Sequence, residues 1–166
     1  MNEAGKTEAH KACLCLGSNI QPETHLRKGI QLLRKHAEVT AHSTAWETRA
    51  VGATDNPNYL NACVSLVTDL APDRLIEEVI RPIEATLGRI RTEDKNAPRV
   101  IDIDLVLYDE RPLRLEYWEE AFMLVPLAEL IPEFIHPFHG QKLAEIAQEA
   151  CKRTWILPHP EVLNDL

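Results

Sequence analysis

The sequence predicts an α+β fold in which helices pack on one mostly antiparallel sheet. Four short segments are rich in apolar or β-branched residues and indicate strands. Two longer segments repeat apolar residues every three or four positions, which is typical of amphipathic helices. The segments follow one another in the order β, α, β, β, α, β. This order matches a ferredoxin-like βαββαβ sandwich, with helices on one face of the sheet and extra helices toward the C-terminus.

The first strand and the first helix lie near the N-terminus. Residues 11–19, KACLCLGSN, are short and apolar, and their final Gly-Ser-Asn is a combination that ends strands and caps helices. Residues 22–36 begin with Pro22, which is favoured in a first helical turn. The apolar residues at helical spacing in this segment are Leu26, Ile30 and Leu33.

Two strands separated by a loop are expected next. Residues 37–51 alternate small and β-branched residues and predict one strand, and residues 52–58 are rich in turn formers. Residues 59–70 alternate clearly between two faces. The residues expected to face the core are Leu60, Ala62, Val64 and Leu66. Those expected on the other face are Tyr59, Asn61, Cys63 and Ser65.

A second helix and a last strand complete the pattern. Residues 71–88 carry apolar residues at helical spacing and end in Gly88, which is favoured at a helix C-terminus. Pro82 lies inside this segment and is expected to kink the helix. A charged loop, residues 89–98, then leads into the apolar stretch 97–110, which predicts a strand.

Length and composition indicate one compact domain. The chain has 166 residues, which is enough to bury a core without disulfides or metal ions. We expect a disordered tail over residues 1–11, the domain over residues 12–150 and a loose tail over residues 151–166. Within the domain, residues 111–118 predict a short hairpin arm and residues 141–150 a last helix.

Charge and hydropathy exclude two kinds of partner. The net charge of −8 argues against a general nucleic-acid surface, because phosphate backbones attract basic patches. No apolar run approaches the roughly 18 residues of a membrane span, and the polar N-terminus lacks the apolar core of a signal peptide. We therefore expect a cytoplasmic monomer that acts on small molecules.

The cysteines and two histidines are expected to have no metal role. Cys13 and Cys15 alternate along one predicted strand, a spacing unlike that of a zinc site or a secreted disulfide framework. Reduced, structural thiols are the better interpretation for them and for Cys63 and Cys151. A His-x-x-His pair follows, but in a loop such a pair is more often a bystander than a metal site. Its members are His136 and His139.

Two aspartates interrupt the last predicted strand. Side chains two apart share a face, so Asp102 and Asp104 point one way while the apolar Ile101, Ile103, Leu105 and Leu107 point the other. Two like charges side by side repel unless a cation lies between them. Paired carboxylates suit Mg²⁺, which takes one or two of them and leaves its other positions to water and substrate phosphates. The alternative is an exposed strand edge that the charges keep soluble.

Nearby arginines favour the metal and phosphate interpretation. Arg89, Arg91 and Arg99 lie in or beside the loop that leads into the aspartate strand. Guanidinium groups are planar, permanently charged donors for phosphate oxygens, and phosphoryl transfer needs both a metal bridge and cationic neutralisation. The combination predicts a nucleotide phosphate site in a protein that is acidic as a whole.

These motifs resemble the 6-hydroxymethyl-7,8-dihydropterin pyrophosphokinase family of folate biosynthesis. The resemblance covers about residues 12–150 and rests on motifs in a fixed order and spacing. The motifs are LGSN, ETRAVGATDNPNYLNACVSL, IEATLGRIR, PRVIDIDLVLY and FMLVPLAELIPEF. It implies an ATP-dependent transfer of pyrophosphate to a pterin alcohol, with AMP released and two Mg²⁺ ions bound.

The resemblance also implies roles for individual residues. Asp102 and Asp104 would hold the metal ions, and Arg89 and Arg99 would clamp the phosphates during transfer. Arg91 and Glu84 would contact the nucleotide, Glu84 through the ribose. The pterin-binding residues would be Thr48, Tyr59, Asn61 and Phe122, with Phe122 stacking on the ring.

The chain departs from the family pattern in two places. Asn96-Ala97 stands where the family usually has a Trp-Gly pair, so Trp118 and Trp155 are considered as replacement lids. The segment from Tyr108 to Phe122 is short, and the histidine and arginine that the family places there for ATP are not identified. Glu120 lies near the arginine position and would disfavour triphosphate. A noncatalytic pterin- or nucleotide-binding homologue, or a kinase for another pterin alcohol such as dihydroneopterin, is therefore the alternative. A third possibility is a structural or protein-interaction domain.

Overall fold

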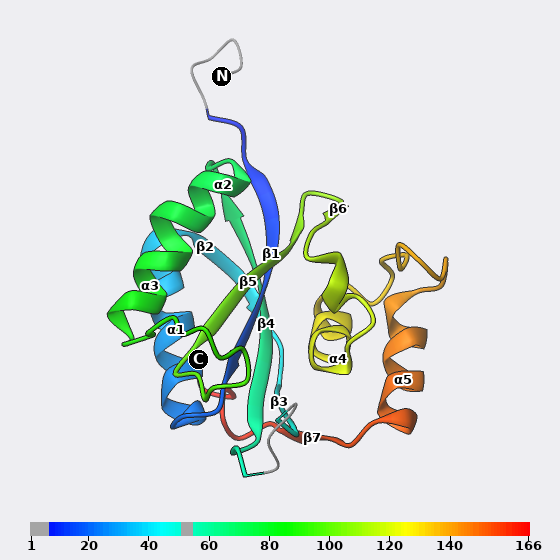
Figure 1. Cartoon of the computed structure of the whole chain (residues 1–166). Coiled ribbons are helices and arrows are strands. Elements are labelled where there is room, and N and C mark those ends of the chain that lie inside the picture. The colour runs from blue at the N-terminus through cyan, green and yellow to red at the C-terminus, as the bar shows by residue number, and fades with distance from the viewer. Residues whose placement is uncertain (1–6, 51–54) are drawn as a thin grey trace.

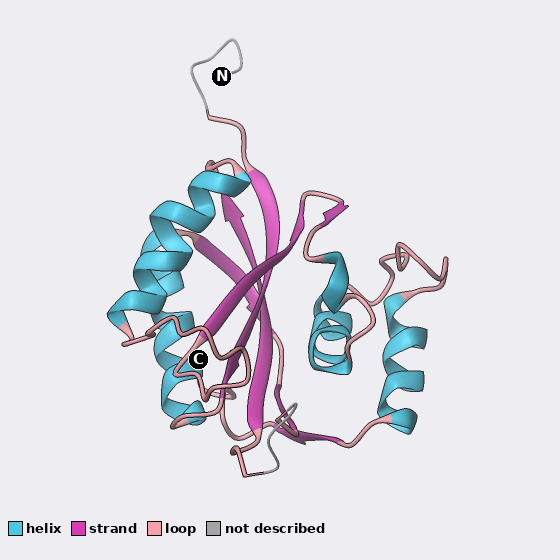
Figure 2. Ribbon diagram, viewed as in Figure 1, coloured by secondary structure: helices cyan, strands magenta, loops and turns pink. Residues whose placement is uncertain are grey.

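A seven-stranded sheet organises the chain in the computed structural model, which describes residues 7–50 and 55–166 (Figures 1 and 2). The strand order is β6-β5-β1-β4-β3-β7, with β2 also paired to β4, and every pairing is antiparallel. The strands are β1 His10–Ser18, β2 Glu38–His42, β3 Ala45–Thr48, β4 Tyr59–Thr68, β5 Asp102–Tyr108, β6 Arg111–Pro112 and β7 Ile156–His159. The predicted α+β class is confirmed, and the predicted βαββαβ order holds with its second strand divided into β2 and β3.

Two helical segments cover one face of the sheet, as expected. They are α1, Pro22–His36, and a composite helix made of α2 Pro72–Leu75, η1 Ile76–Ile80 and α3 Arg81–Thr86. Their apolar sides pack against the inward residues of β1, β4 and β5 in one buried cluster. The four residues predicted to face the core from β4 all belong to this cluster. The hydrophobic period in the sequence therefore located this layer correctly.

The other face of the sheet is also covered, which corrects the prediction of helices on one face only. Helices α4, Ala121–Leu130, and α5, Leu143–Arg153, lie on this side (Figure 1). Their apolar residues form a second buried cluster with Cys13, Cys15 and Cys63. All four cysteines are free, in line with the expected thiols. The alternation in β4 identified one face as core and missed that the second is buried as well.

The composite helix continues through Pro82 without a break. Five residues, Ile76–Ile80, form a π-helical turn immediately before α3, and Pro82 then lies in the first turn of α3. Proline removes a backbone donor, and a wider turn upstream is a common way for a helix to accommodate the change. A kink at Pro82 was expected, and the structure shows instead a π-helical turn before it. The helix then continues through α3, which contains Glu84.

A bulge in the aspartate strand corrects one detail of its predicted faces. Asp102 and Asp104 pair with Gly17 and Cys15 and share a face, as expected. The register then shifts, because Leu105 pairs with Leu14 and Leu107 with Cys13. One extra residue reverses the phase of a strand, so Leu107 joins the second cluster while Leu105 stays in the first.

The predicted strand over residues 37–51 is wrong as a single element. It is divided into β2 and β3, because Ser43 turns its backbone and side chain toward β4. Its N–H donates to Cys63 O at 2.9 Å, and its Oγ accepts from Cys63 N at 2.9 Å. Both strands keep their pairing with β4.

The segment after Cys151 is ordered, which corrects the expected loose tail. Strand β7 pairs with β3, Val162 and Leu163 are buried, and Arg27 donates to Val162 O at 2.8 Å. At the other end, residues 1–6 of the expected N-terminal tail lie outside the described residues, and β1 begins at His10. Among the described residues, no helix has the length and apolar content that crossing a membrane requires.

Candidate functional site

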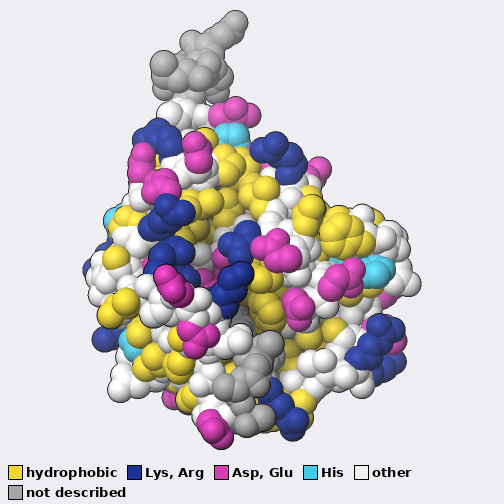
Figure 3. Space-filling model, viewed as in Figure 1, with side chains coloured by type: hydrophobic (Ala, Val, Ile, Leu, Met, Phe, Trp, Pro, Cys, Tyr) yellow, Lys and Arg dark blue, Asp and Glu magenta, His cyan; other side chains and the backbone are white. Residues whose placement is uncertain are grey.

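Two cavities meet at the aspartate pair. Cavity I has a volume of about 180 Å³ and opens between β1, β4 and the start of α4. Cavity II, of about 520 Å³, opens between β5 and the composite helix. All ten residues predicted for the site line one or both cavities. The residues shared by the two are Lys95, Arg99, Asp102, Asp104 and Tyr117. Figure 3 shows basic and acidic side chains gathered beside a hollow near the centre of this face.

Asp102 is held between two arginines. Arg89 Nη1 donates to its Oδ1 at 2.8 Å, and Arg99 Nη1 donates to its Oδ2 at 2.9 Å. The Asp102 side chain is 18% exposed and that of Arg89 12%, so this group of charges lies largely out of water. Charge-assisted bonds of this kind are stronger than neutral ones and fix the geometry of the carboxylate.

Asp104 is paired with an arginine that the sequence analysis missed. Arg114 lies in the short segment between Tyr108 and Phe122, and its Nη1 donates to Asp104 Oδ1 at 2.8 Å. Burial, and then the charge of Asp102, raise the pKa of Asp104 to about 7. A carboxyl group with this pKa is readily neutralised and needs cations nearby to stay charged.

Glu84 is a buried anchor of the arginines and not an ordinary helix-surface carboxylate. It is 3% exposed, and its Oε2 accepts from Ile103 N at 3.0 Å and from Arg89 Nη1. Arg91, which is exposed, approaches the other oxygen at 3.6 Å. Burial raises the pKa of Glu84. Both groups line cavity II.

Asn61 presents a defined edge to cavity I. Its Nδ2 donates to Trp46 O at 3.1 Å and to Thr48 Oγ1 at 2.9 Å. A backbone carbonyl only accepts, so the amide nitrogen must lie on that side, and Oδ1 is the atom left for a ligand donor. Gly17 lies opposite, and a Cβ there would meet this Oδ1 at 3.2 Å. The glycine in the Leu-Gly-Ser-Asn motif therefore keeps room for the amide.

Aromatic rings form one side of cavity I. Phe122 and Tyr117 pack edge to face with ring centroids 5.3 Å apart, and Tyr59 lines the same cavity. Tyr117 was missed by the sequence analysis, although it lies three residues after Arg114 in a short 3₁₀ turn, Leu115–Tyr117. Its hydroxyl contacts Arg114 Nη2 at 2.8 Å. Burial and then Asp104 raise the pKa of Tyr117 to about 12, so the ring stays neutral.

Asn19 positions the loop that carries Arg99. Its Oδ1 accepts from Arg99 N at 2.6 Å, and its N–H donates to Arg99 O at 3.1 Å. Its Nδ2 donates to Pro57 O at 3.3 Å, and this bond connects the loop before β4 to Asn19. The motif was interpreted as a helix cap, but the residue before α1 is Gln21 and makes no side-chain cap. Asn19 is therefore a positioning residue.

The loop before β4 and the loop before β5 contact each other beside cavity I. Asn56 Nδ2 donates to Asn96 O at 2.7 Å. Residues 51–54 of the first loop lie outside the described residues. Trp118 cannot replace the absent lid tryptophan, because it is fully buried. Trp155 is 41% exposed, and the Arg49 guanidinium lies 5.2 Å from its ring centroid. Arg49 lines cavity I, but Trp155 does not.

Glu120 lies away from the paired charges. It lines a third depression, with Arg49, Trp155 and α5, and does not line cavity II. The expected repulsion toward a triphosphate is therefore not built into cavity II. The cations that do line it are Arg81, Arg89, Arg91, Lys95, Arg99 and Arg114.

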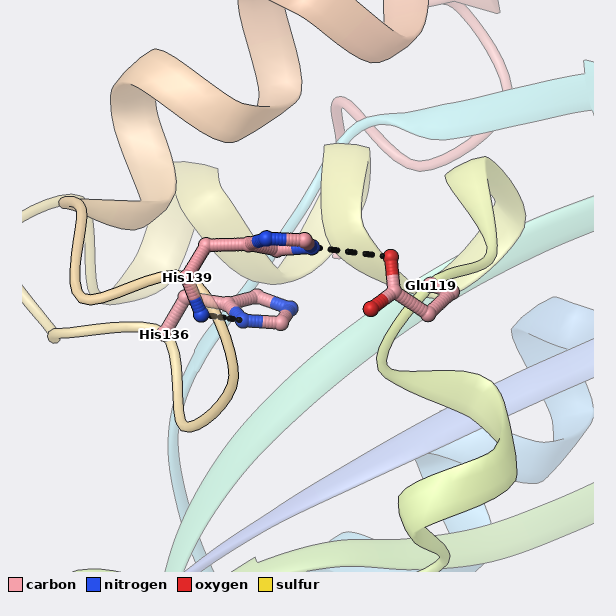
Figure 4. A group of neighbouring side chains, drawn as sticks. All are labelled: Glu119, His136 and His139. Atoms are coloured by element: carbon pink, nitrogen blue, oxygen red, sulfur yellow. Dashed lines mark hydrogen bonds and ion pairs between the residues drawn. The ribbon is translucent and has the colours of Figure 1, made fainter.

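A cluster of residues of types that bind metals lies outside cavities I and II (Figure 4). Its members are Glu119, His136 and His139. His136 Nδ1 accepts from the backbone N–H groups of Phe138 at 3.1 Å and His139 at 3.3 Å. Its Nε2 faces the carbonyl oxygen of Trp118 and must therefore carry the proton. Both ring nitrogens of His136 are engaged, so this side chain has no free nitrogen for a metal ion. A bystander role for the pair stays a prediction.

His136→Ala is expected to lower the free energy of unfolding by about 2–3 kcal/mol, because it leaves buried backbone groups without partners. His139→Ala is the matched control, since that side chain is 45% exposed, and is expected to change stability by less than about 0.5 kcal/mol. Chemical denaturation measures both. Equal stability of the two variants, or a Zn²⁺-induced rise in the parent Tm, would contradict this account.

The aspartate pair fits a hard divalent cation. Asp102 and Asp104 both line the two cavities and offer carboxylate oxygens there, and the surrounding arginines suit phosphate oxygens. Such a set of groups can hold Mg²⁺ together with the phosphates of a nucleotide.

Comparisons with known proteins agree on one family. The family model of 7,8-dihydro-6-hydroxymethylpterin-pyrophosphokinase (HPPK) matches residues 13–132. A Synechocystis 2-amino-4-hydroxy-6-hydroxymethyldihydropteridine pyrophosphokinase is 34% identical over 162 residues, covering 89% of this chain and 80% of its own. The protein of the same name from Methylorubrum extorquens is 42% identical over 137 residues, covering 75% of this chain and 85% of its own.

A solved structure supports the fold. Plasmodium falciparum HPPK-DHPS A437G with STZ-DHP superposes with a TM-score of 0.70 at 13% identity. The match covers 90% of this chain and 47% of the Plasmodium chain, so the chain spans about half the length of that protein. At this identity the likeness concerns the fold alone.

Proposed function

The chain belongs to the 7,8-dihydro-6-hydroxymethylpterin-pyrophosphokinase family, and we propose that it transfers pyrophosphate from ATP to the hydroxymethyl group of 6-hydroxymethyl-7,8-dihydropterin in folate biosynthesis. AMP is the second product. The observation that carries the proposal is the junction of the two cavities at Asp102 and Asp104. A flat heterocycle in cavity I and a triphosphate in cavity II would meet there.

Cavity I suits the pterin. Phe122, Tyr117 and Tyr59 offer aromatic faces, and Asn61 Oδ1 offers an acceptor for a ring N–H. Thr48 fixes the Asn61 amide by accepting one of its hydrogens. These contacts would orient the pterin with its hydroxymethyl group toward the aspartates.

Cavity II suits the nucleotide. Arg89 and Arg99 lie beside Asp102 and would neutralise phosphate oxygens, and Arg91 and Glu84 would contact the remainder of the nucleotide. Asp102 and Asp104 would hold Mg²⁺, two ions by the family resemblance, and bound Mg²⁺ supplies charge neutralisation and alignment of the phosphates. The chain has no Gly-x-x-x-x-Gly-Lys phosphate loop, so side-chain cations would bind the phosphates.

The reaction is a direct displacement. The pterin hydroxyl attacks the β-phosphorus of ATP, the bond to the α-phosphate oxygen breaks, and AMP leaves. The protein contributes alignment, water exclusion and charge neutralisation, with no covalent enzyme intermediate. A monomer acting in the cytoplasm stays a prediction.

Chromatographic product analysis tests this function. Protein incubated with Mg-ATP and 6-hydroxymethyl-7,8-dihydropterin is expected to form AMP only when the pterin is present. Dihydroneopterin in a parallel reaction tests the other pterin alcohol. Formation of AMP with dihydroneopterin alone would overturn the proposed substrate, and binding without AMP would overturn catalysis.

Asn61→Ala is expected to raise the KM for the pterin by about 10- to 100-fold, because it removes a buried acceptor for a ring N–H. Ser65→Ala is the control on the same strand, since Ser65 contacts Thr40 and lines neither cavity. Steady-state kinetics with each substrate varied measure the effect. A KM for the pterin that stays within about twofold of the parent value would contradict the assignment of Asn61.

A further inference from the structure

Arg114 occupies a metal-ligand oxygen of the proposed site. Its Nη1 donates to Asp104 Oδ1 at 2.8 Å, and it lines cavity II beside Arg89 and Arg99. The same pattern holds at Asp102, where each carboxylate oxygen accepts from an arginine. In this structure, guanidinium groups neutralise both aspartates.

A divalent cation that binds Asp104 Oδ1 competes with this guanidinium, because both are positive and both bind the same carboxylate oxygen. Arg114 is the arginine best placed to leave, because its side chain is 44% exposed, against 12% for Arg89 and 30% for Arg99.

The remaining contacts of Arg114 would keep it in the cavity after the exchange. Its Nε donates to Glu116 Oε1 at 2.7 Å, its Nη2 contacts the Tyr117 hydroxyl at 2.8 Å, and its guanidinium lies 4.7 Å from the Tyr117 ring centroid. These partners lie on its own 3₁₀ turn and do not depend on Asp104. A released Arg114 therefore stays beside the space for the triphosphate, where its planar donors match phosphate oxygens.

We propose that Arg114 is an exchangeable counter-ion, which neutralises Asp104 in the free protein and moves to a nucleotide phosphate when the metal and nucleotide bind. This inference rests on the proposed function. It makes Arg114 oppose metal binding in the absence of nucleotide and favour nucleotide binding in the presence of metal. A residue that only supported the fold would affect both in the same direction.

Arg114→Gln tests the exchange through binding alone, without turnover. Mn²⁺ without nucleotide, followed by electron paramagnetic resonance, is expected to bind about 3- to 10-fold more tightly, because its competitor is removed. The nonhydrolysable analogue α,β-methylene-ATP with Mg²⁺, followed by calorimetry, is expected to bind about 10-fold more weakly. Arg111→Gln is the matched control, since Arg111 lies on neighbouring β6, is exposed and lines neither cavity.

The two affinities separate the possible outcomes. Opposite shifts in Arg114→Gln, with neither shift in Arg111→Gln, would support the exchange. Weakening of both affinities, or no change in either, would overturn it. A parent protein that binds no ATP analogue would overturn the proposed function and the move to phosphate, while the Mn²⁺ titration would still decide whether Arg114 competes for Asp104.

Discussion

Replacing both aspartates, as Asp102→Asn with Asp104→Asn, is expected to lower kcat by at least about 10³-fold. The substitution removes the carboxylates at the junction of the two cavities while keeping their shape, so the proposed Mg²⁺ would lose the ligands that let it align and neutralise the phosphates. Pterin binding, measured by fluorescence titration, should persist, because Asn61 and the aromatic rings stay in place.

Asp109→Asn is the control for this variant. Asp109 lies just beyond the same strand, pairs with His10 at 2.9 Å and lines neither cavity. Its backbone φ of 53° is a conformation that asparagine tolerates. Activity of Asp109→Asn should stay within about twofold of the parent value. A doubly substituted enzyme that retained a tenth of the parent kcat would refute the role of the aspartates.

Arg99→Ala is expected to lower kcat by about 10²- to 10³-fold. Its guanidinium contacts Asp102 and Lys95 O, and it borders both cavities, so it lies where charge on the transferred group would develop. Rapid-quench measurement of a single turnover would separate this chemical effect from binding. Arg99→Lys should recover only part of the rate, because a lysine cannot reproduce the planar, two-armed contact.

Arg74→Ala provides the comparison for the loss of an arginine. Arg74 is exposed and forms an i,i+4 pair with Glu78 on the composite helix, away from both cavities. Its removal should leave the rate unchanged. If Arg99→Ala turned over as fast as Arg74→Ala, Arg99 would have no part in the transfer. Circular dichroism of each variant confirms that the fold is kept.

Local periodicity predicted most of the fold. The helical spacing in α1 reflects one buried face, and the alternation in β4 identifies the face that packs against the helices, so both can be recognised without knowledge of the rest of the chain. The second layer was harder to predict, since α4 is apolar on nearly all sides and contains Pro126. Strand β7 was not predicted, because its pairing with β3 joins segments more than 100 residues apart and its own sequence shows only a short, weak strand pattern.

The ten predicted site residues were named because they match family motifs, and the structure places all of them around the two cavities. Arg114 and Tyr117 were missed because the chain is short between β5 and α4, and spacing there could not be matched to the family pattern. The 3₁₀ turn brings both side chains back to Asp104. Asn19 was assigned to capping from its local motif. Its hydrogen bonds to Arg99 and Pro57 join distant parts of the sequence, and a local motif cannot reveal them.

Phosphorus NMR of one reaction mixture tests the central claim most directly, since it identifies the group that is transferred. With Mg-ATP and 6-hydroxymethyl-7,8-dihydropterin, we expect the ATP resonances to be replaced by that of AMP and by two coupled resonances of a pterin diphosphate, in equal amounts. This result would place the attack at the β-phosphorus. Formation of ADP with a pterin monophosphate, or of free phosphate without a pterin product, would contradict it.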